Sequence, residues 1–198
     1  MRHGDSLSVL VPVKSFTRAK ARLAPTLTPA ERADLARSMA ESVLHAAGGL
    51  DVWVVCDDDD VAAWARDLGA GVAWHPGTGL DGAVSAACAD RFAEGSSRVA
   101  VVHGDLPLLE SMAWLDQEGA AVVLVPDRHG TGTNVISTPT PAFRFAYGPN
   151  SFARHVAEVE RLGLELSVVR DRAMGWDIDV PSDLSAIDGS LRGPSASH

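Results

Sequence analysis

Four basic side chains follow an apolar segment near the start of the chain, and their charges suit the binding of phosphate groups. The run 7–10, continued by Val11, predicts a first strand that ends in a loop. The basic residues of this loop are Lys14, Arg18, Lys20 and Arg22. Residues 2–22 contain five Lys or Arg and one acid, whereas the whole chain has a formal net charge of −9. A basic loop after an early strand is where an α/β fold holds polyphosphate, and a solvated loop is the plainer alternative.

Three aspartates in two separate segments form a second group of candidate residues. Asp105 lies in the turn His-Gly-Asp-Leu-Pro directly after an apolar strand, and Asp177 and Asp179 precede a short helix expected at 181–186. Carboxylates from two strand ends can hold a hard cation such as Mg²⁺ against substrate phosphates. For Asp179, an N-cap of the short helix is an equally good explanation. Asp177 has no such structural alternative.

A glycine pattern lies between the third expected strand and the helix that follows it. Residues 77–82, Gly-Thr-Gly-Leu-Asp-Gly, match G-x-G-x-x-G. In dinucleotide-binding folds this pattern follows the first strand and is accompanied by an acid for the ribose, and neither condition is met here. A glycine-lined wall against a nucleotide base or ribose fits the pattern, and a plain turn remains open.

Two later segments rich in glycine and hydroxyl residues can offer backbone N–H groups to an anion. The run 130–134, Gly-Thr-Gly-Thr-Asn, follows the fifth expected strand and has the composition of an anion-binding nest. The run 147–151, Tyr-Gly-Pro-Asn-Ser, leads into a helix with Ser151 as its expected N-cap, where free N–H groups attract phosphate or carboxylate. An ordinary turn and a capped helix are the alternatives.

The consecutive aspartates 57–60 permit two interpretations. They can be aligned with the D-x-D-x-V pattern of phosphatases that use an aspartyl nucleophile. We favour a strand end followed by an N-cap and first-turn acids, because a helix N-terminus stabilises negative charge.

The elements that must position these residues alternate between strands and helices. Beyond the first strand, the expected strands are 51–56, 71–75, 98–103, 120–126 and 165–169, with an extended segment at 135–137. The expected helices are 28–47, opened by a capping box with Pro29, and 60–68, 80–94 and 151–162. Helical crossovers between strands predict an α/β fold, a mainly parallel sheet with helices on both faces.

Composition limits the class of protein. We expect residues 1–188 to form a single domain and the small, polar segment 189–198 to be a disordered tail. The net charge of −9 argues against nucleic acid or an anionic membrane surface as a partner. No apolar stretch approaches the roughly 20 residues of a membrane span. Cys56 and Cys88 are expected to be small buried hydrophobes in a cytoplasmic protein.

Several of these segments together resemble one enzyme family. The resembling residues are 12–14, 19–23, 79–80, 104–107, 127–134, 147–152 with His155, and 177–184. They resemble the guanylyltransferases of coenzyme F-420 biosynthesis, which activate phosphoenolpyruvate, 2-phospho-L-lactate or a similar phosphorylated acid with GTP. The likeness extends over residues 11–184 and implies a GT-A-like (Rossmann-like) nucleotidyltransferase fold.

The resemblance implies a reaction and a role for each matching residue. A phosphate oxygen of the acceptor acid attacks the α-phosphorus of GTP, and pyrophosphate leaves. Residues implied in catalysis are Lys14, Lys20, Arg22 and Asp105. Residues implied in nucleotide binding are Pro12, Lys14, Lys20, Arg22, Gly79, Leu80 and Asp81. Thr133, Gly148 and Ser151 are implied in binding the acceptor, and Asp105, Asp177 and Asp179 in binding Mg²⁺.

The resemblance also leaves choices open. At position 81 the family usually has asparagine, so Asp81 replaces an amide that both donates and accepts with a group that only accepts. Relatives that look like this chain commonly use phosphoenolpyruvate, which is therefore the expected acceptor. The two alternatives are a nucleotidyltransferase of the same fold with another nucleotide and acceptor, and a nucleotide-binding module without catalysis.

Overall fold

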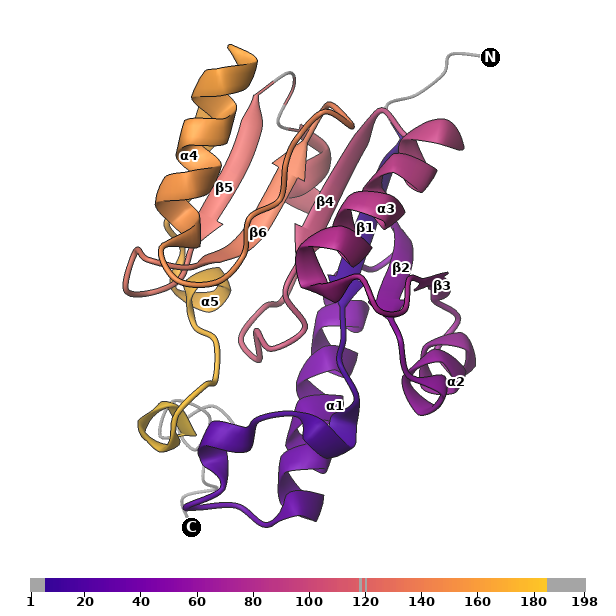
Figure 1. Ribbon diagram of the computed structural model, residues 1–198, viewed down its shortest axis with the longest axis vertical. Coiled ribbons are helices and arrows are strands. Elements are labelled where there is room, and N and C mark those ends of the chain that lie inside the picture. Colours follow the sequence, from indigo (N-terminus) through magenta and orange to yellow (C-terminus); the bar gives the residue numbers. More distant parts are fainter. Residues whose placement is uncertain (1–5, 118, 120, 185–198) are drawn as a thin grey trace, which may run out of the picture.

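The fold is a seven-stranded sheet, shown in Figure 1 by a computed structural model that describes residues 6–117, 119 and 121–184. The strands are β1 (Leu7–Pro12), β2 (Asp51–Cys56), β3 (Gly71–Trp74), β4 (Arg98–Val102), β5 (Val122–Pro126), β6 (Thr133–Thr138) and β7 (Leu166–Val168). They lie in the order β3-β2-β1-β4-β6-β5-β7. Every pairing is parallel except those of β6, which runs antiparallel to both β4 and β5.

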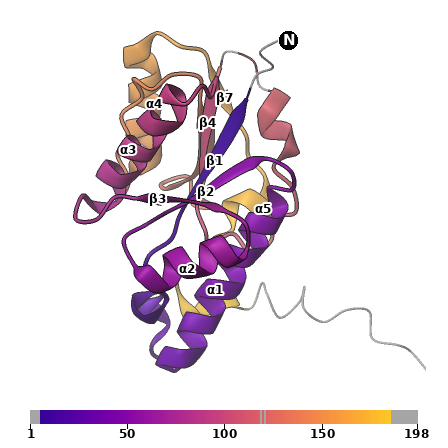
Figure 2. The same cartoon turned by 90° about the vertical axis from the view of Figure 1, so that its right-hand side faces the viewer.

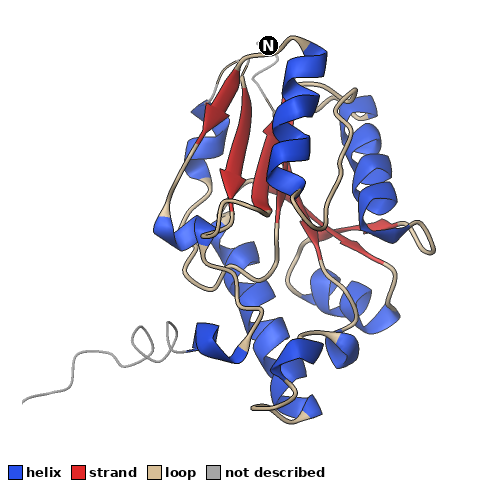
Figure 3. Cartoon of the chain, turned by 60° about the vertical axis from the view of Figure 1, so that its left-hand side comes forward, coloured by secondary structure: helices blue, strands red, loops and turns tan. Residues whose placement is uncertain are grey.

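Helices cover both faces of this sheet. They are α1 (Pro29–Ala46), α2 (Asp59–Asp67), α3 (Gly79–Ala93), α4 (Ser151–Leu162) and α5 (Arg172–Gly175). Short 3-10 turns are η1 (Phe16–Arg18), η2 (Ala21–Leu23), η3 (Ala113–Gln117) and η4 (Pro181–Leu184). Figure 2 shows α3 and α4 on one side of the strands and α1 with α5 on the other. In Figure 3, α4 comes forward and lies across the strands that it covers.

The alternation of side chains along the central strands produces two cores. On β1, Val9 and Val11 pack with α1 residues such as Val43, whereas Leu10 points to the opposite core. That second core receives Val84 from α3, among others. Because successive strand residues point to opposite faces, a strand that is apolar throughout must be covered on both sides. The apolar runs in the sequence therefore required helices on both faces.

Local signals fix the helix boundaries. Thr28 accepts a hydrogen bond from the backbone N–H of Glu31, the Glu31 carboxylate accepts from the backbone N–H of Thr28, and Pro29 is the first helical residue. Asp58 caps α2 by accepting from the backbone N–H of Val61 at 3.2 Å. The capping interpretation of the aspartate run is therefore confirmed. These caps satisfy N–H groups that the first helical turn leaves without partners.

The expected α/β class is confirmed, with a few differences. The four expected helices end within about two residues of their predicted limits, and the segment expected to be extended at 135–137 is strand β6. The short helix expected from Pro181 forms as the 3-10 turn η4, and α5 was not expected. Both cysteines are buried and free. The tail predicted at 189–198 lies outside the described residues. No helix in the described part of the chain is long and apolar enough to cross a membrane.

Candidate active site

A cavity of about 780 Å³ opens at the carboxyl ends of β1, β2 and β4. Strand β2, which follows β1 in the sequence, lies on one side of β1, and β4 lies on its other side. The strand order therefore reverses between β1 and β4. Parallel sheets bind ligands at such a switch point, because the loops leave the sheet in opposite directions and open a crevice. Eight of the residues for which a catalytic, nucleotide-binding or metal-binding role was implied line the cavity: Pro12, Lys14, Lys20, Arg22, Gly79, Leu80, Asp105 and Asp179.

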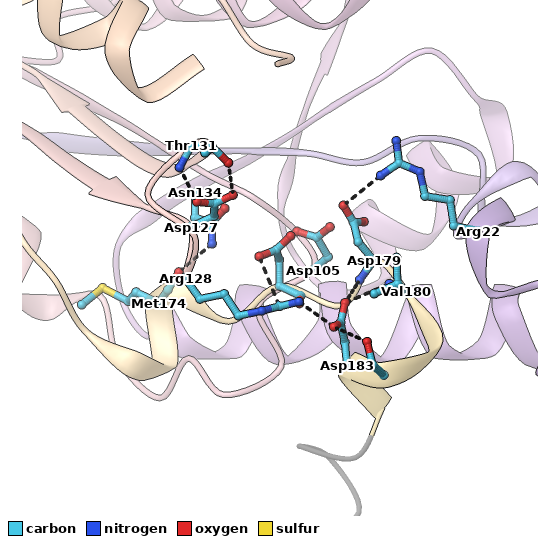
Figure 4. Close-up of polar contacts among 12 residues, drawn as sticks. Arg22, Asp105, Asp127, Arg128, Thr131, Asn134, Met174, Asp179, Val180 and Asp183 are labelled. Carbon is cyan, nitrogen blue, oxygen red and sulfur yellow. Dashed lines mark hydrogen bonds and ion pairs between the residues drawn. The ribbon is translucent and has the colours of Figure 1, made fainter. Parts of the chain in front are cut away.

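Lys20 connects the basic loop to both acidic segments. Its Nζ lies 2.6 Å from Oδ2 of Asp105 and 3.3 Å from Oδ1 of Asp179. Arg22 reaches the other oxygen of Asp179 at 3.8 Å, and this pair can be followed in Figure 4. Lys20 has a left-handed backbone with φ of 53°. A residue with a β-carbon adopts this conformation at a cost in free energy, which surrounding contacts must offset. Such strained residues are common at functional sites.

The charges of this group depend on one another. Burial by itself would lower the pKa of Lys20, but Asp105 and Asp179 outweigh it and raise that pKa. Burial would likewise raise the pKa of Asp105, but the Lys20 ammonium and then His103 hold it below its ordinary value. Both groups are therefore charged near neutral pH. The other oxygen of Asp105, Oδ1, is buried and has no hydrogen-bond partner among the described residues.

Asp177 lies on the same segment as Asp179. Between them Ile178 is fully buried against Leu23 and Met39. Burial, followed by the nearby charges of Asp105 and Asp179, raises the pKa of Asp177. Asp177 does not line the cavity, yet its carboxylate is close enough to the other two to be repelled by them.

The donor set fits a hard divalent cation. The unpartnered Oδ1 of Asp105 and the mutual repulsion of three carboxylates indicate negative charge that the protein itself does not fully neutralise. Among the described residues, no three His, Cys, Asp or Glu side chains form a complete metal-binding group. Mg²⁺ is commonly bound by one or two carboxylates together with waters and substrate phosphates, and the carboxylates of Asp105 and Asp179, which line the cavity, can meet this requirement.

A smaller groove of about 340 Å³ adjoins the start of α3. It is lined by Thr78, Gly79, Leu80, Asp81, Tyr147 and Gly148. Gly79 has a φ of 69°, which a residue with a β-carbon rarely adopts. Oδ1 of Asp81 accepts a hydrogen bond from the backbone N–H of Tyr147 at 2.8 Å. Asp81 therefore joins α3 to the loop before α4, and its second carboxylate oxygen is left for other partners.

Of the three residues predicted for the acceptor, Gly148 lines this groove, whereas Thr133 and Ser151 line neither the groove nor the larger cavity. The hydroxyls of Thr133 and Ser151 are 3.4 Å apart, and both side chains are buried. Nε2 of His155 accepts from the backbone N–H of Ala146 at 3.0 Å, so Nδ1 carries the proton and donates to the Thr133 hydroxyl at 2.9 Å. Burial, followed by the charge of Arg154, lowers the pKa of His155 from 6.5 to about 4. The imidazole is therefore neutral near pH 7.

Comparison with known proteins decides the family. The family described as "Guanylyl transferase CofC like" matches residues 7–192. A phosphoenolpyruvate guanylyltransferase of Sphaerobacter thermophilus is 36% identical over 191 residues, which cover 91% of each chain. A 2-phospho-L-lactate guanylyltransferase of Methanothermobacter thermautotrophicus is 34% identical over 187 residues, which cover 90% of this chain and 82% of that protein.

The chain belongs to the CofC-like guanylyl transferase family.

Solved structures place this CofC-like chain in the nucleotidyltransferase fold. A protein of Desulfovibrio desulfuricans G20, described as a candidate nucleotide-diphospho-sugar transferase, superposes with a TM-score of 0.75 at 19% identity, covering 96% of this chain and 89% of that one. A 4-diphosphocytidyl-2C-methyl-D-erythritol synthase gives a TM-score of 0.62 at 14% identity, covering 94% and 98%. The fold expected from the sequence is confirmed.

The two predicted anion nests are filled by the CofC-like chain's own groups. In the first, the carboxylate of Asp127 accepts from the backbone N–H of Thr131 at 2.8 Å and from its hydroxyl at 3.3 Å, as Figure 4 shows. In the second, the backbone N–H of Ser151 donates to the carbonyl of Gly148 at 3.1 Å, and that of Phe152 donates to the carbonyl of Thr131. For the N–H groups of Thr131, Ser151 and Phe152 the prediction of a donor free for an anion is wrong, because carboxylate and carbonyl oxygens of the chain already accept from them.

Two predicted helix caps also differ. Ser151 is the first residue of α4, and Asn150, with φ of 57°, is its N-cap. Asp179 does not cap η4 with its carboxylate, which instead faces Lys20 and Arg22. The N-cap alternative for Asp179 is therefore wrong, and its side chain is available to the site.

Several cavity-lining residues were not predicted as site residues, and two of them, Arg18 and His103, carry polar groups close to Lys20 and Asp105 in the sequence. Arg18 belongs to the same basic loop as Lys20, and His103 directly follows β4, two residues before Asp105. Nε2 of His103 is buried without a hydrogen-bond partner among the described residues. Its position next to a strand end was a usable signal, because ligands of such a sheet bind at the carboxyl ends of the strands.

Proposed function

We propose that this protein transfers GMP from GTP to the phosphate of phosphoenolpyruvate, with release of pyrophosphate, in coenzyme F-420 biosynthesis. The relatives from Sphaerobacter thermophilus and Rubrobacter xylanophilus, at 36% and 34% identity, are named for phosphoenolpyruvate. The relative named for 2-phospho-L-lactate is 34% identical. The two acids both carry a carboxylate next to a phosphorylated oxygen, so the second remains the alternative acceptor.

One observation carries the proposal most directly. The basic loop and the acidic segments, separated by up to 159 residues, meet across Lys20 in a cavity at the switch point of the sheet. A pure phosphate-binding site requires the cations but gives no reason for carboxylates in contact with them. Carboxylates near bound phosphates are explained by a divalent cation that must sit between the two.

The residues present can support the reaction without a general base. A phosphate monoester has a second pKa of about 6 and is mostly dianionic near neutral pH, so the acceptor is already nucleophilic. Lys14, Lys20 and Arg22 line the cavity and would bind the triphosphate and stabilise the pyrophosphate that leaves. The protein's contribution is thus positioning and charge neutralisation.

Asp105, Asp177 and Asp179 would hold Mg²⁺, which supplies positive charge against the reacting phosphate oxygens. Once the phosphates bind, Lys20 has anionic partners besides Asp105 and Asp179. The acceptor's carboxylate belongs near Gly148, Thr133 and Ser151, beside the smaller groove. Asp81, on the wall of that groove, can accept from a guanine N–H with the oxygen that Tyr147 does not use.

The test is pyrophosphate release by the full chain with GTP and Mg²⁺, comparing phosphoenolpyruvate, 2-phospho-L-lactate and phosphoglycerates. We expect turnover with GTP and the highest kcat/KM with phosphoenolpyruvate. Repeating the assay with ATP, CTP and UTP tests the alternative of another nucleotide, and GTP binding without pyrophosphate release would support the non-catalytic alternative. Folded protein that releases no pyrophosphate with any of these acids contradicts the proposal.

A further inference from the structure

Arg128 and Asp183 form an ion pair outside the cavity, next to the segment that carries Asp177 and Asp179. Nη2 of Arg128 lies 2.5 Å from Oδ1 of Asp183, which is 2% exposed. Neither residue lines the cavity. Figure 4 shows the pair beside Asp105 and Asp179, with the Arg128 side chain extending from the loop between β5 and β6.

Asp183 holds the backbone on the Asp179 side of the segment. Its Oδ2 accepts from the backbone N–H groups of Asp179 and Val180, both at 2.8 Å. These bonds fix the backbone of Asp179, from which its side chain extends. A buried carboxylate with two backbone donors and an arginine has its hydrogen-bonding capacity nearly filled, so it has little freedom to move.

Arg128 holds the backbone on the Asp177 side. Its Nη1 donates to the Asp177 carbonyl at 2.9 Å and lies 4.0 Å from Oδ1 of the Asp177 carboxylate. Its own backbone N–H donates to the carbonyl of Gly175 at 2.8 Å, and its guanidinium lies 4.7 Å from the Trp176 ring centre. One side chain therefore contacts the segment on both sides of Asp177.

We infer that Arg128 and Asp183 are positioning residues, which hold the segment of Asp177 and Asp179 beside Asp105 so that a carboxylate of this segment and that of Asp105 can share a divalent cation. The inference rests on the proposed function. Asp105 and Asp179 raise the pKa of Asp177 through their negative charges, so contacts that hold this carboxylate near them must offset a repulsion. The guanidinium also offsets part of this repulsion from a direction that leaves the cavity side free.

The competing explanation is that the pair only stabilises the end of the domain. Ile178, buried between Leu23 and Met39, anchors the segment in any case. An apolar anchor fixes the position of one residue but sets the direction of its neighbours less strictly than hydrogen bonds do. Both explanations therefore predict that loss of the ion pair lowers stability, but only the positioning role predicts that it weakens cation binding.

The experiment measures Mn²⁺ binding by the full chain in the presence of a GTP analogue with a methylene bridge between the α- and β-phosphates. Asp183→Asn and Arg128→Lys are compared with the wild type, and the melting temperature of each is recorded. The matched control is Glu158→Gln on α4. Glu158 is 8% exposed and, like Asp183, accepts from a backbone N–H, that of Arg144 at 2.9 Å, and from an arginine, Arg161 at 2.6 Å.

We expect Asp183→Asn to raise the Kd for Mn²⁺ at least tenfold, whereas Glu158→Gln loses melting temperature with an unchanged Kd. Arg128→Lys keeps the charge but loses the two-pronged contact, so its Kd rises as well. If Asp183→Asn does not fold, the Kd of Arg128→Lys for Mn²⁺ tests the inference. Wild-type Mn²⁺ affinity in both variants, with turnover intact in the wild type, overturns this inference and leaves the proposed function standing. A wild type without pyrophosphate release overturns both.

Discussion

The ammonium of Lys20 lies 2.6 Å from the carboxylate of Asp105, across 85 residues of sequence. The contact joins a loop after β1 to the turn after β4, the two neighbouring strands on either side of the switch point. It is charge-assisted and partly shielded from water, with side-chain exposures of 10% for Lys20 and 25% for Asp105, so it is stronger than a surface ion pair. Both partners face the cavity, and each can therefore be tested through catalysis as well as stability.

Replacing Asp105 with Asn keeps the size of the side chain and removes its charge. If the carboxylate binds the divalent cation, we expect kcat to fall by roughly 10², which corresponds to about 3 kcal/mol of lost transition-state stabilisation. Melting temperature and Mg²⁺-dependent turnover should be measured on one preparation. A variant that melts early but turns over normally would mean that Asp105 serves the fold and not the reaction.

Replacing Lys20 with Met removes the ammonium while leaving an L-residue in the same left-handed conformation, so the backbone cost is unchanged. We expect the KM for GTP to rise about tenfold or more, because a phosphate partner is lost. Stability should fall by about 1–3 kcal/mol, since the partly buried carboxylate of Asp105 loses its nearest cation. Lys14→Met is the control for stability. Steady-state kinetics with an unchanged KM for GTP would place the triphosphate elsewhere.

Replacing Ser151 with Ala tests the acceptor side. The hydroxyl lies beside that of Thr133, whereas the backbone N–H already donates to Gly148, so the side chain is the group to remove. Loss of one hydrogen bond, worth about 0.5–1.5 kcal/mol, should raise the KM for phosphoenolpyruvate about two- to tenfold and leave the KM for GTP nearly unchanged. Equal weakening of both substrates argues against an acceptor site here.

The stability of the protein should fall as pH decreases from 6.5 to 4 because of His155. Its pKa is about 4 in the folded chain and 6.5 when exposed, so the unfolded chain binds more protons in this interval. The stabilisation is complete above 6.5, decreases through the interval by at most about 3 kcal/mol, and changes no further below 4. Denaturant unfolding of wild type and His155→Gln at several pH values checks this. Parallel curves for the two proteins would show that His155 does not contribute.

Much of the fold was predictable because its signals are local. The capping box at Thr28 and the apolar run of β2 determine nearby hydrogen bonds, so the residues that form the element also mark its limits. The site residues on β1 and β4 were predictable for a related reason. The end of a buried parallel strand identifies the ligand side of the sheet before any contact is known.

Other features depend on partners far away in sequence. Strand β6 runs antiparallel between β4 and β5, and the loop that precedes it turns the Asp127 carboxylate into the predicted nest. A run of glycine and hydroxyl residues indicates that backbone N–H groups can converge, but it does not indicate which acceptor they bind. In the structure that acceptor is the Asp127 carboxylate of the same chain.

The sequence by itself determined the class of fold, the main elements and the basic and acidic segments of the site, because each follows from the types and spacing of neighbouring residues. Only the tertiary structure decided which charges meet. Lys20 contacts both Asp105 and Asp179, and Arg128 and Asp183 hold the acidic segment from behind. Those contacts span 55–159 residues, so they exist only after the sheet has set the order and direction of its strands.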